Sequence, residues 1–384
     1  MVNGMMRRLL CVLWLSILGS TAQASSSEQV LVGTLGRMPI VMELSISDPQ
    51  KVTGRYFYQK YHRDLALAGT LEGQSLQLRE GRQGYEQDSP PQATLQLQRT
   101  ADGWQGQWQG AKGKVLEVRL APASAEAPTP EALPYLAQLY QKDLYEYLRF
   151  QGLPLKQGKQ QNFMGYTLQW WSEPSSQLSM FKVIAGYPQD RQDLLNQLLM
   201  ERLWREVQAY HECLLEAGES GEFTQTVKPQ FFSRTLLSVN IGTSYTCGGA
   251  HPDNGDSPLN IDVNSGRSLL LTDVLWVGKG QPLKPADYSA LYEYNTGRLG
   301  PWLVKQFTAL HPREMRPISE DEGCNYSDPS VWGDNAWYFT PKGLFIKALF
   351  PRVQRACDGP EWAVLPYSVI RKHPGAMVLE LPQR

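Results

Sequence analysis

The sequence lacks the features that would place the chain in a membrane or on nucleic acid. Its N-terminal apolar run, Leu9–Leu18, has about ten residues and is too short to span a bilayer as a helix, and no later run approaches that length. Lysine and arginine number 37 and aspartate and glutamate 38, a formal net charge of −1. Because nucleic-acid-binding proteins normally carry a basic footprint, we expect neither a nucleic-acid partner nor a membrane span in the mature chain.

The first residues have the pattern of a secretory signal peptide. Arg7 and Arg8 precede the apolar run, and Ala22–Ala24 supplies the small residues of a cleavage site. We therefore predict a signal peptide over residues 1–24, cleaved after Ala24, and an exported, periplasmic protein. A mature length near 360 residues allows two or three domains, each able to bury a core.

Cysteine is scarce, and its distribution fits an exported protein. Of the five cysteines, Cys11 lies in the apolar run and four remain in the mature chain. An even number in an oxidising compartment favours two disulfides over free thiols. Four cysteines allow three pairings, and spacing does not choose among them. We favour Cys213–Cys247 and Cys324–Cys357, because each pair closes a loop of about 33 residues between neighbouring elements.

The N-terminal part alternates apolar and polar residues with a period of two. Pairs such as Leu76 and Leu78, or Leu95 and Leu97, place leucines on one face, and glycine turns separate the runs. This alternation predicts a β-rich domain over residues 25–120, an antiparallel meander that forms a small barrel or a sandwich. Residues 121–130 contain three prolines and no periodicity, which predicts an Ala/Pro linker.

Beyond the linker the pattern changes to helices mixed with strands. Apolar residues recur at helical spacing over Leu133–Leu148, and a long helix is predicted over Arg191–Ala217, with Asp190 as its N-cap and Gly218 as its C-cap. Residues 131–384 therefore read as an α+β domain, and the whole chain as α+β. The other predicted elements are strands at 167–171, 180–184, 223–227 and 235–241, a helix near 286–310, and two hairpins, 259–263 with 269–271 and 337–339 with 344–350.

Several ordered segments of the second half form one pattern. They are Leu236–Asn240 (LLSVN), Tyr245–Pro252 (YTCGGAHP), Ile261–Arg267 (IDVNSGR), Leu271–Leu275 (LTDVL), Phe339–Leu344 (FTPKGL) and Val364–Ser368 (VLPYS). The pattern resembles the extracytoplasmic C-terminal domain of lysozyme-sensing anti-sigma factors of the RsiV type, which is also found in certain peptidoglycan deacetylases. The resemblance covers about residues 175–373.

This resemblance implies a non-enzymatic, exported cell-envelope binding protein whose ligand is a lysozyme-like hydrolase or peptidoglycan, with no cofactor. We expect the contact surface at the loops 248–256, 320–328 and 351–359. One departure from the family is the segment Arg352–Gly359, where the family is rich in tyrosine and proline. Common-type lysozymes are strongly basic, so Arg352 and Arg355 would oppose encounter with them. The candidate contact residues are Tyr245, His251, Asp253, Glu320, Asp321, Glu322, Arg352 and Arg355.

No catalytic motif names a reaction, and histidine is scarce, at five residues. Within the Gly-Gly-Ala-His-Pro segment, Gly248 and Gly249 permit an unusual backbone, and a hydrogen-bonded His251 would fix the loop. The alternative is a cell-wall glycan-modifying hydrolase or deacetylase-like enzyme that uses Asp253 or His251, although no nucleophile accompanies them. The acidic run 320–322 is either a solvated loop or a surface that binds a basic partner.

Two further residue sets invite a ligand. His211, Cys213, Cys247 and His251 nominally form a zinc set, but the oxidising compartment favours disulfides, so we predict no metal. The tryptophans Trp170, Trp171, Trp332, Trp337 and Trp362 could stack on sugar rings, although most are expected in the core, where tryptophan is commonly found.

Overall fold

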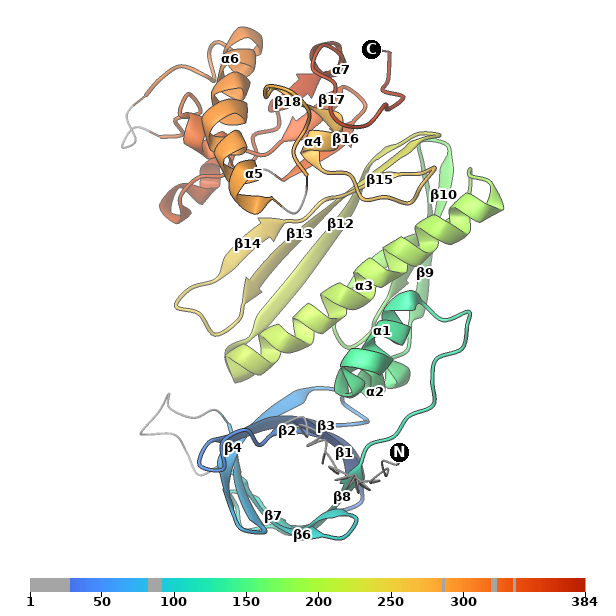
Figure 1. The fold of residues 1–384 in the computed structure, drawn as a ribbon, viewed down its shortest axis with the longest axis vertical. Helices are drawn as coiled ribbons and strands as arrows, with labels where there is room; N and C mark the ends of the chain where they lie inside the picture. Colours follow the sequence, from blue (N-terminus) through green and yellow to red (C-terminus); the bar gives the residue numbers. More distant parts are fainter. Residues whose placement is uncertain (1–27, 82–91, 285–286, 319–322, 334–335, 384) are drawn as a thin grey trace, which may run out of the picture.

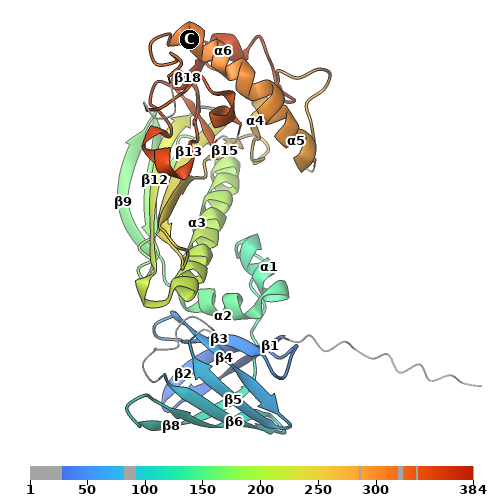
Figure 2. The same ribbon diagram turned by 90° about the vertical axis from the view of Figure 1, so that its left-hand side faces the viewer.

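The computed structural model describes residues 28–81, 92–284, 287–318, 323–333 and 336–383. Figures 1 and 2 show a β-barrel at one end of the molecule, a central part with two sheets and a long helix, and a C-terminal part at the other end. The predicted α+β class is confirmed. Within the described residues, no helix is long and apolar enough to cross a bilayer. The signal peptide predicted for residues 1–24 lies outside the described residues.

The N-terminal meander is a closed eight-stranded barrel, which decides between the barrel and the sandwich. Each strand pairs with the next, and the last pairs with the first. The alternating leucines, Leu76, Leu78, Leu95 and Leu97 among them, lie in its core. The last strand runs into the predicted linker, as far as Pro122. The strands are β1 (Glu28–Leu35), β2 (Met38–Ser45), β3 (Val52–Tyr58), β4 (Asp64–Glu72), β5 (Ser75–Glu80), β6 (Thr94–Thr100), β7 (Gly103–Gln109) and β8 (Val115–Pro122).

Glycines allow neighbouring barrel strands to approach closely. A Cβ atom added at Gly33, Gly69 or Gly106 would lie 1.9 Å from a carbonyl oxygen of the adjacent strand. Such contacts are impossible for any other residue, and glycines of this kind let a strand bend as the sheet closes on itself. The glycines that punctuate the alternating pattern are therefore part of the reason why the meander forms a barrel.

Two short helices, rather than the single predicted one, follow the barrel. They are α1 (Pro134–Lys142) and α2 (Leu144–Gly152), separated at Asp143. The Asp143 backbone is not helical, and its side chain accepts a hydrogen bond from the backbone N–H of Glu146 at 3.0 Å. An aspartate that caps the next helix in this way ends the preceding one. The apolar spacing continued across the break, so the periodicity alone did not reveal it.

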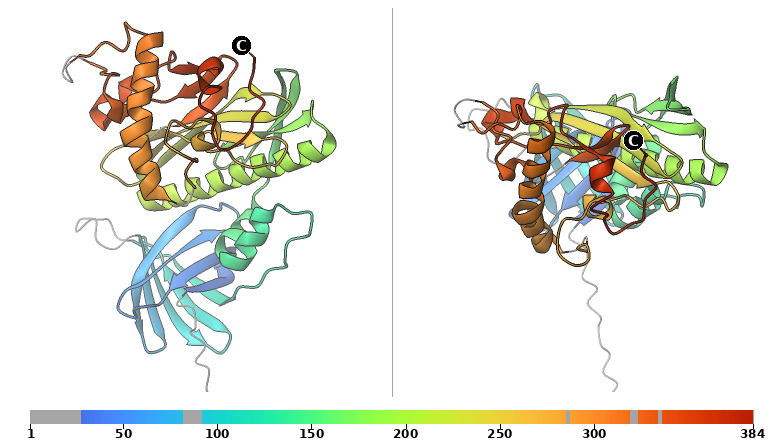
Figure 3. Two further views of the ribbon diagram at one scale, coloured as in Figure 1. Left: turned by 45° about the horizontal axis from the view of Figure 1, so that its top comes forward. Right: turned by 90° about the horizontal axis from the view of Figure 1, so that it is seen from above.

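The central part holds the long helix α3 (Gln189–Ala217) between two antiparallel sheets and the barrel (Figure 3). Gly218 is its C-cap, as predicted, but its N-cap is Pro188, and Asp190 lies in the first turn. The side chain of Asn196 on α3 bonds to both the N–H and the C=O of Val183. The strands are β9 (Lys156–Phe163), β10 (Tyr166–Ser172), β11 (Ser179–Ala185), β12 (Glu222–Phe232), β13 (Leu236–Thr246), β14 (Asp253–Asp256) and β15 (Leu259–Asp262).

The C-terminal part packs a small sheet and several helices around buried aromatic residues such as Trp332 and Phe307. The strand predicted at 269–271 is wrong: only Ser268 forms a bridge, to Ile261, and Leu271 begins a helix. The elements are α4 (Leu271–Val274), α5 (Tyr288–Tyr294), a π-helical segment η2 (Asn295–Leu299), α6 (Gly300–Leu310), η4 (Pro329–Trp332), β16 (Trp337–Thr340), β17 (Gly343–Ile346), η5 (Arg352–Cys357), β18 (Val364–Pro366) and α7 (Tyr367–Ile370).

A buried cluster of charged residues joins the barrel to α2. Arg149 is fully buried and donates to Asp64 at 2.6 Å, to Glu146 at 2.9 Å and to the carbonyl of His62. Arg55 of β3 also donates to Glu146, at 3.0 Å. Burial raises the pKa of Glu146, although the two arginines act to lower it. These contacts hold the barrel against the rest of the chain through ion pairs that sequence periodicity does not reveal.

Candidate functional site

Two segments that are distant in sequence meet at a shallow surface hollow of about 490 Å³. One is the turn between β13 and β14, and the other is η5. We call this surface the loop hollow. Two of the three loops predicted to carry the contact surface therefore meet in the structure. The loop hollow is lined by His251, Pro252, Asp253, Asn254, Arg352, Val353 and Arg355.

The first wall of the loop hollow is fastened to the end of α3. A disulfide joins Cys213 of α3 to Cys247, four residues before His251. Gly248 has φ +80°, and a Cβ atom there would lie 2.7 Å from the carbonyl oxygen of Glu216. Only glycine fits this close approach. Gly249 meets no such restriction, so one of the two glycines is needed for the backbone and the other is not.

The second wall of the loop hollow is fastened in the same manner. A disulfide joins Cys324 to Cys357, the last residue of η5, as the loop lengths favoured. The Asp358 side chain accepts a hydrogen bond from the backbone N–H of Phe350 at 2.7 Å, and the Tyr326 hydroxyl donates to the carbonyl of Cys357 at 2.8 Å. Both ends of the η5 segment are therefore held before any ligand binds.

The two walls contact each other through arginine side chains. Arg355 forms ion pairs with Asp253 at 3.5 Å, across the loop hollow, and with Asp358 at 3.2 Å, on its own segment. Arg352 donates to the backbone carbonyl of Pro252. These arginines, predicted as candidates for contact with a partner, therefore bind the opposite wall of their own protein. Most of the charge of Arg355 is offset by its two carboxylate neighbours.

A further ion pair holds the strand β14, which carries part of the first wall. Lys347, which is nearly buried, donates to Asp256 at 2.6 Å, and Asn240 donates to the other carboxylate oxygen of Asp256 at 3.1 Å. Asp256 is the last residue of β14, so this pair fixes the strand that carries Asp253 and Asn254. The floor of the loop hollow is a hydrogen-bonded part of the sheet.

The other predicted contact residues divide into three groups. His251 is exposed on the rim, and none of the hydrogen bonds among the described residues involves its side chain, so the predicted loop-fixing hydrogen bond is absent there. Tyr245 lies on β13 opposite Asp253, with its ring stacked near Phe223 at 6.4 Å, and does not line the loop hollow. The acidic residues Glu320, Asp321 and Glu322 lie outside the described residues.

The nominal zinc set cannot supply thiolates. Cys213 and Cys247 are bonded to each other, and His211 is buried within the molecule, 3% exposed. Burial lowers the pKa of His211 well below its ordinary value, and the nearby Arg149 acts in the same direction. The same disulfide removes Cys247 as a nucleophile beside His251.

Sequence reasoning missed the apolar residue of the site. Val353 is 94% exposed, and it stands between the two arginines of η5. Two arginines around a single valine gave a weak signal, because an apolar residue in a loop commonly turns inward. The start of η5 is exposed from Arg352 to Val353, whereas its last residue, Cys357, is buried.

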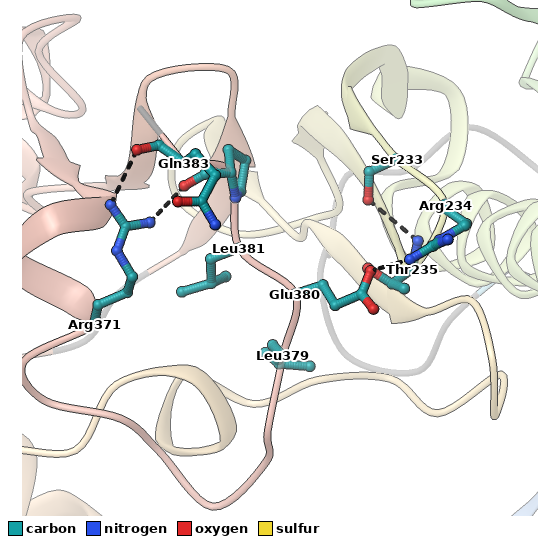
Figure 4. A pocket seen from close by; sticks show the side chains of 9 residues that line it. Ser233, Arg234, Thr235, Arg371, Leu379, Glu380, Leu381 and Gln383 are labelled. Carbon is teal, nitrogen blue, oxygen red and sulfur yellow. Dashed lines mark hydrogen bonds and ion pairs between the residues drawn. The ribbon is translucent and has the colours of Figure 1, made fainter.

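A second hollow of about 470 Å³ lies between the β12–β13 turn and the segment 379–383 (Figure 4). Its charged side chains bond to other groups of the protein. Arg371 donates to the carbonyls of Pro382 at 2.5 Å and Gln383 at 3.4 Å, and Arg234 pairs with Glu380 at 2.8 Å. These bonds hold the segment against the body of the protein, which explains the hollow without a ligand.

No family model and no curated protein matches the sequence. Two solved structures described as DUF3298 family proteins align with part of it. The one from Bacteroides fragilis NCTC 9343 has 15% identity and a TM-score of 0.35, and the alignment covers 58% of this chain and 94% of that one. The one from Pseudomonas aeruginosa PAO1 also has 15% identity, with a TM-score of 0.29 and the same two coverages. At these values the similarity establishes neither a family nor a function for the chain.

Proposed function

We propose that the chain is a non-catalytic, exported binding protein of the cell envelope that binds a lysozyme-like hydrolase at the loop hollow. The observation that carries the proposal is the construction of this surface. Two segments, each fastened by its own disulfide, are joined across the hollow by Arg352 and Arg355, and the exposed side chain of Val353 stands between these arginines.

Fastened loops favour tight binding to a protein. A mobile loop loses conformational freedom when a partner immobilises it, at a cost of about 0.5 to 1.5 kcal/mol for each flexible side chain. The two disulfides and the contacts between the walls order this surface in advance, so less freedom is lost on binding. An exposed valine on an ordered surface can then be buried in an apolar pocket of a partner, which removes its side chain from water.

The residue types of the lining favour binding of a protein over binding of a sugar, and they favour binding over catalysis. None of the described lining residues is tryptophan, tyrosine or phenylalanine, the rings on which sugars stack. None carries a hydroxyl or thiol nucleophile, and Asp253 already pairs with Arg355.

The charge of the loop hollow is compatible with a basic partner. Arg355 is offset by Asp253 and Asp358, so the repulsion expected from two free arginines is reduced. Arg352 remains as an exposed positive charge although it donates to a backbone carbonyl. We therefore expect an association rate with weak salt dependence.

The test is calorimetric titration of the oxidised chain from Ser25 onward with a common-type lysozyme. Saturable binding is expected, and Val353→Asp should weaken it at least tenfold, which is about 1.4 kcal/mol. Val115→Asp is the matched control, since Val115 is 50% exposed on the barrel, and it should bind as the unmodified chain does. Absence of binding would refute the partner, whereas equal loss in both variants would refute the site.

The enzymatic alternative makes a separate prediction. An enzyme acting on cell-wall glycan through Asp253 or His251 would release soluble fragments from peptidoglycan, and Asp253→Asn and His251→Ala would abolish that release. We expect no turnover by the unmodified chain. Turnover that both variants abolish would replace the binding proposal.

A further inference from the structure

A larger groove, of about 740 Å³, runs between the sheet of β9 and β10 and the strand β12. Figure 2 shows β9 beside β12, on the side of the molecule away from α5. We call it the tryptophan groove. It shares no lining residue with the loop hollow. It is lined by Lys159, Gln161, Trp170, Ser179, Thr226, Val227, Lys228, Pro229 and Gln230.

The tryptophan of this groove is held in one orientation. The Nε1–H of Trp170 donates to Oε1 of Gln161 at 2.9 Å, and its ring meets Phe181 edge to face, with centroids 5.4 Å apart. Phe181 is fully buried, so it gives the ring a rigid support. Trp332, by contrast, is fully buried in the C-terminal core and is not available to a ligand. An ordered, partly exposed ring on a groove wall is suited to stacking against a flat apolar face.

The charge of the groove has one sign. Lys159 on β9 and Lys228 on β12 are both exposed, and neither forms an ion pair with the described part of the chain. None of the groove's lining residues is an aspartate or a glutamate. Two uncompensated ammonium groups on opposite walls favour an anionic ligand that lies between them.

The remaining lining groups favour sugars over an added peptide strand. Gln161, Gln230, Ser179 and Thr226 bring amides and hydroxyls, which can pair with the hydroxyl groups of a saccharide. Both β9 and β12 are edge strands of their sheets, and at the β12 edge Pro229 lacks an N–H and the strand register shifts immediately after it. Proline and a bulge both interrupt the ladder that an added strand requires.

We propose that the tryptophan groove binds a strand of an acidic polysaccharide. One sugar ring stacks on Trp170, the amides and hydroxyls bond to its substituents, and carboxylates of the strand pair with Lys159 and Lys228. The inference does not depend on the partner proposed for the loop hollow, because the two surfaces have no residue in common.

The first experiment titrates the oxidised chain with a hexamer of galacturonic acid, followed by tryptophan fluorescence and calorimetry. Saturable binding is expected, at least tenfold tighter than for the neutral galactose hexamer and for a poly-glutamate peptide of the same charge. No binding of the acidic hexamer would overturn the proposal. Equal binding of the neutral hexamer would overturn the role of the lysines, and tighter binding of the peptide would overturn the sugar.

Variants then locate the site. The exposed pair Lys159→Gln with Lys228→Gln should weaken binding tenfold or more, whereas the control pair Lys112→Gln with Lys114→Gln, exposed on a barrel turn, should leave it unchanged. Equal effects of the two pairs would show general charge attraction and overturn the site. Trp170→Phe should reduce affinity and abolish the fluorescence change.

The two proposals are distinguished by Val353→Asp, which lies at the loop hollow. It should leave binding of the hexamer unchanged. Loss of hexamer binding in this variant would assign the sugar to the loop hollow and refute the groove.

Discussion

Replacing Arg149 with methionine tests the junction between the barrel and α2. The guanidinium of Arg149 donates to Asp64, to Glu146 and to the carbonyl of His62, and its side chain is completely buried. Methionine fills similar space but leaves the two carboxylates with Arg55 as their remaining cationic partner in the cluster. Removing one member of a buried ion cluster costs about 3 to 5 kcal/mol, because the remaining charges stay buried without compensation.

The assay is urea unfolding at pH 7, followed by circular dichroism and tryptophan fluorescence. We expect Arg149→Met to lower the free energy of unfolding by about 3 to 5 kcal/mol. We also expect the barrel to unfold separately from the α+β part, in a transition of its own. Arg119→Met is the matched control, since Arg119 lies on the outside of the barrel and pairs with an exposed Glu117. An exposed pair contributes about 0 to 1 kcal/mol.

Two results would refute this reasoning. A loss below about 1 kcal/mol in Arg149→Met, equal to that in the control, would mean that the buried cluster adds nothing beyond a surface pair. A single transition, unchanged in cooperativity, would mean that other contacts hold the barrel against α2.

Two further predictions follow from the structure, and a third follows from the sequence. Burial lowers the pKa of His211, so only the unfolded chain takes up a proton there as the pH falls below about 6.5, and this residue lowers stability by up to about 1.4 kcal/mol per pH unit. Burial also lowers the pKa of His62, so His211→Leu should reduce the slope between urea titrations at pH 7.5 and 5.5 and leave the part due to His62. A slope equal to that of the unmodified chain contradicts the prediction. Cys324→Ser with Cys357→Ser should lower the free energy of unfolding by about 4 kcal/mol in the loop-entropy model. The double variant should also release a bound partner faster. An unchanged dissociation rate would contradict the role of this disulfide in ordering the second wall of the loop hollow. If the acidic run 320–322, which lies outside the described residues, binds the basic partner, Glu320→Lys with Glu322→Lys should abolish lysozyme binding in the same titration, whereas unchanged affinity would exclude the run from the contact surface.

Local patterns predicted the elements that local chemistry determines. Alternating leucines such as Leu76 and Leu78 predicted the meander, and Gly218 predicted the end of α3. The choice between barrel and sandwich depended on close approach between strands at glycines such as Gly33, which a single strand does not reveal. Asp143 broke a helix that the apolar spacing continued through, because its side chain bonded to the next turn.

Contacts between residues far apart in the sequence could not be predicted from the sequence alone. Arg149 and Asp64 are 85 residues apart, and nothing in either segment marks them as partners. The site was predictable as separate loops, because the resemblance singled out His251 and its departure at Arg352–Gly359 singled out Arg355. Their meeting across the loop hollow was not predictable, nor was the outward position of Val353, since both depend on how β14 and η5 pack.

The contact between α3 and β11 has a consequence for the behaviour of the chain at high concentration. Among the described strands, β11 pairs with β10 alone, and on its other side Asn196 bonds to both polar backbone groups of Val183. An open strand edge is a template for the strand of another molecule. The helix therefore shields an edge that would otherwise promote aggregation, and partial unfolding that moves α3 away would expose it. Heating that detaches α3 should thus add the β11 edge to the edges of β9 and β12 that are already open to strand pairing.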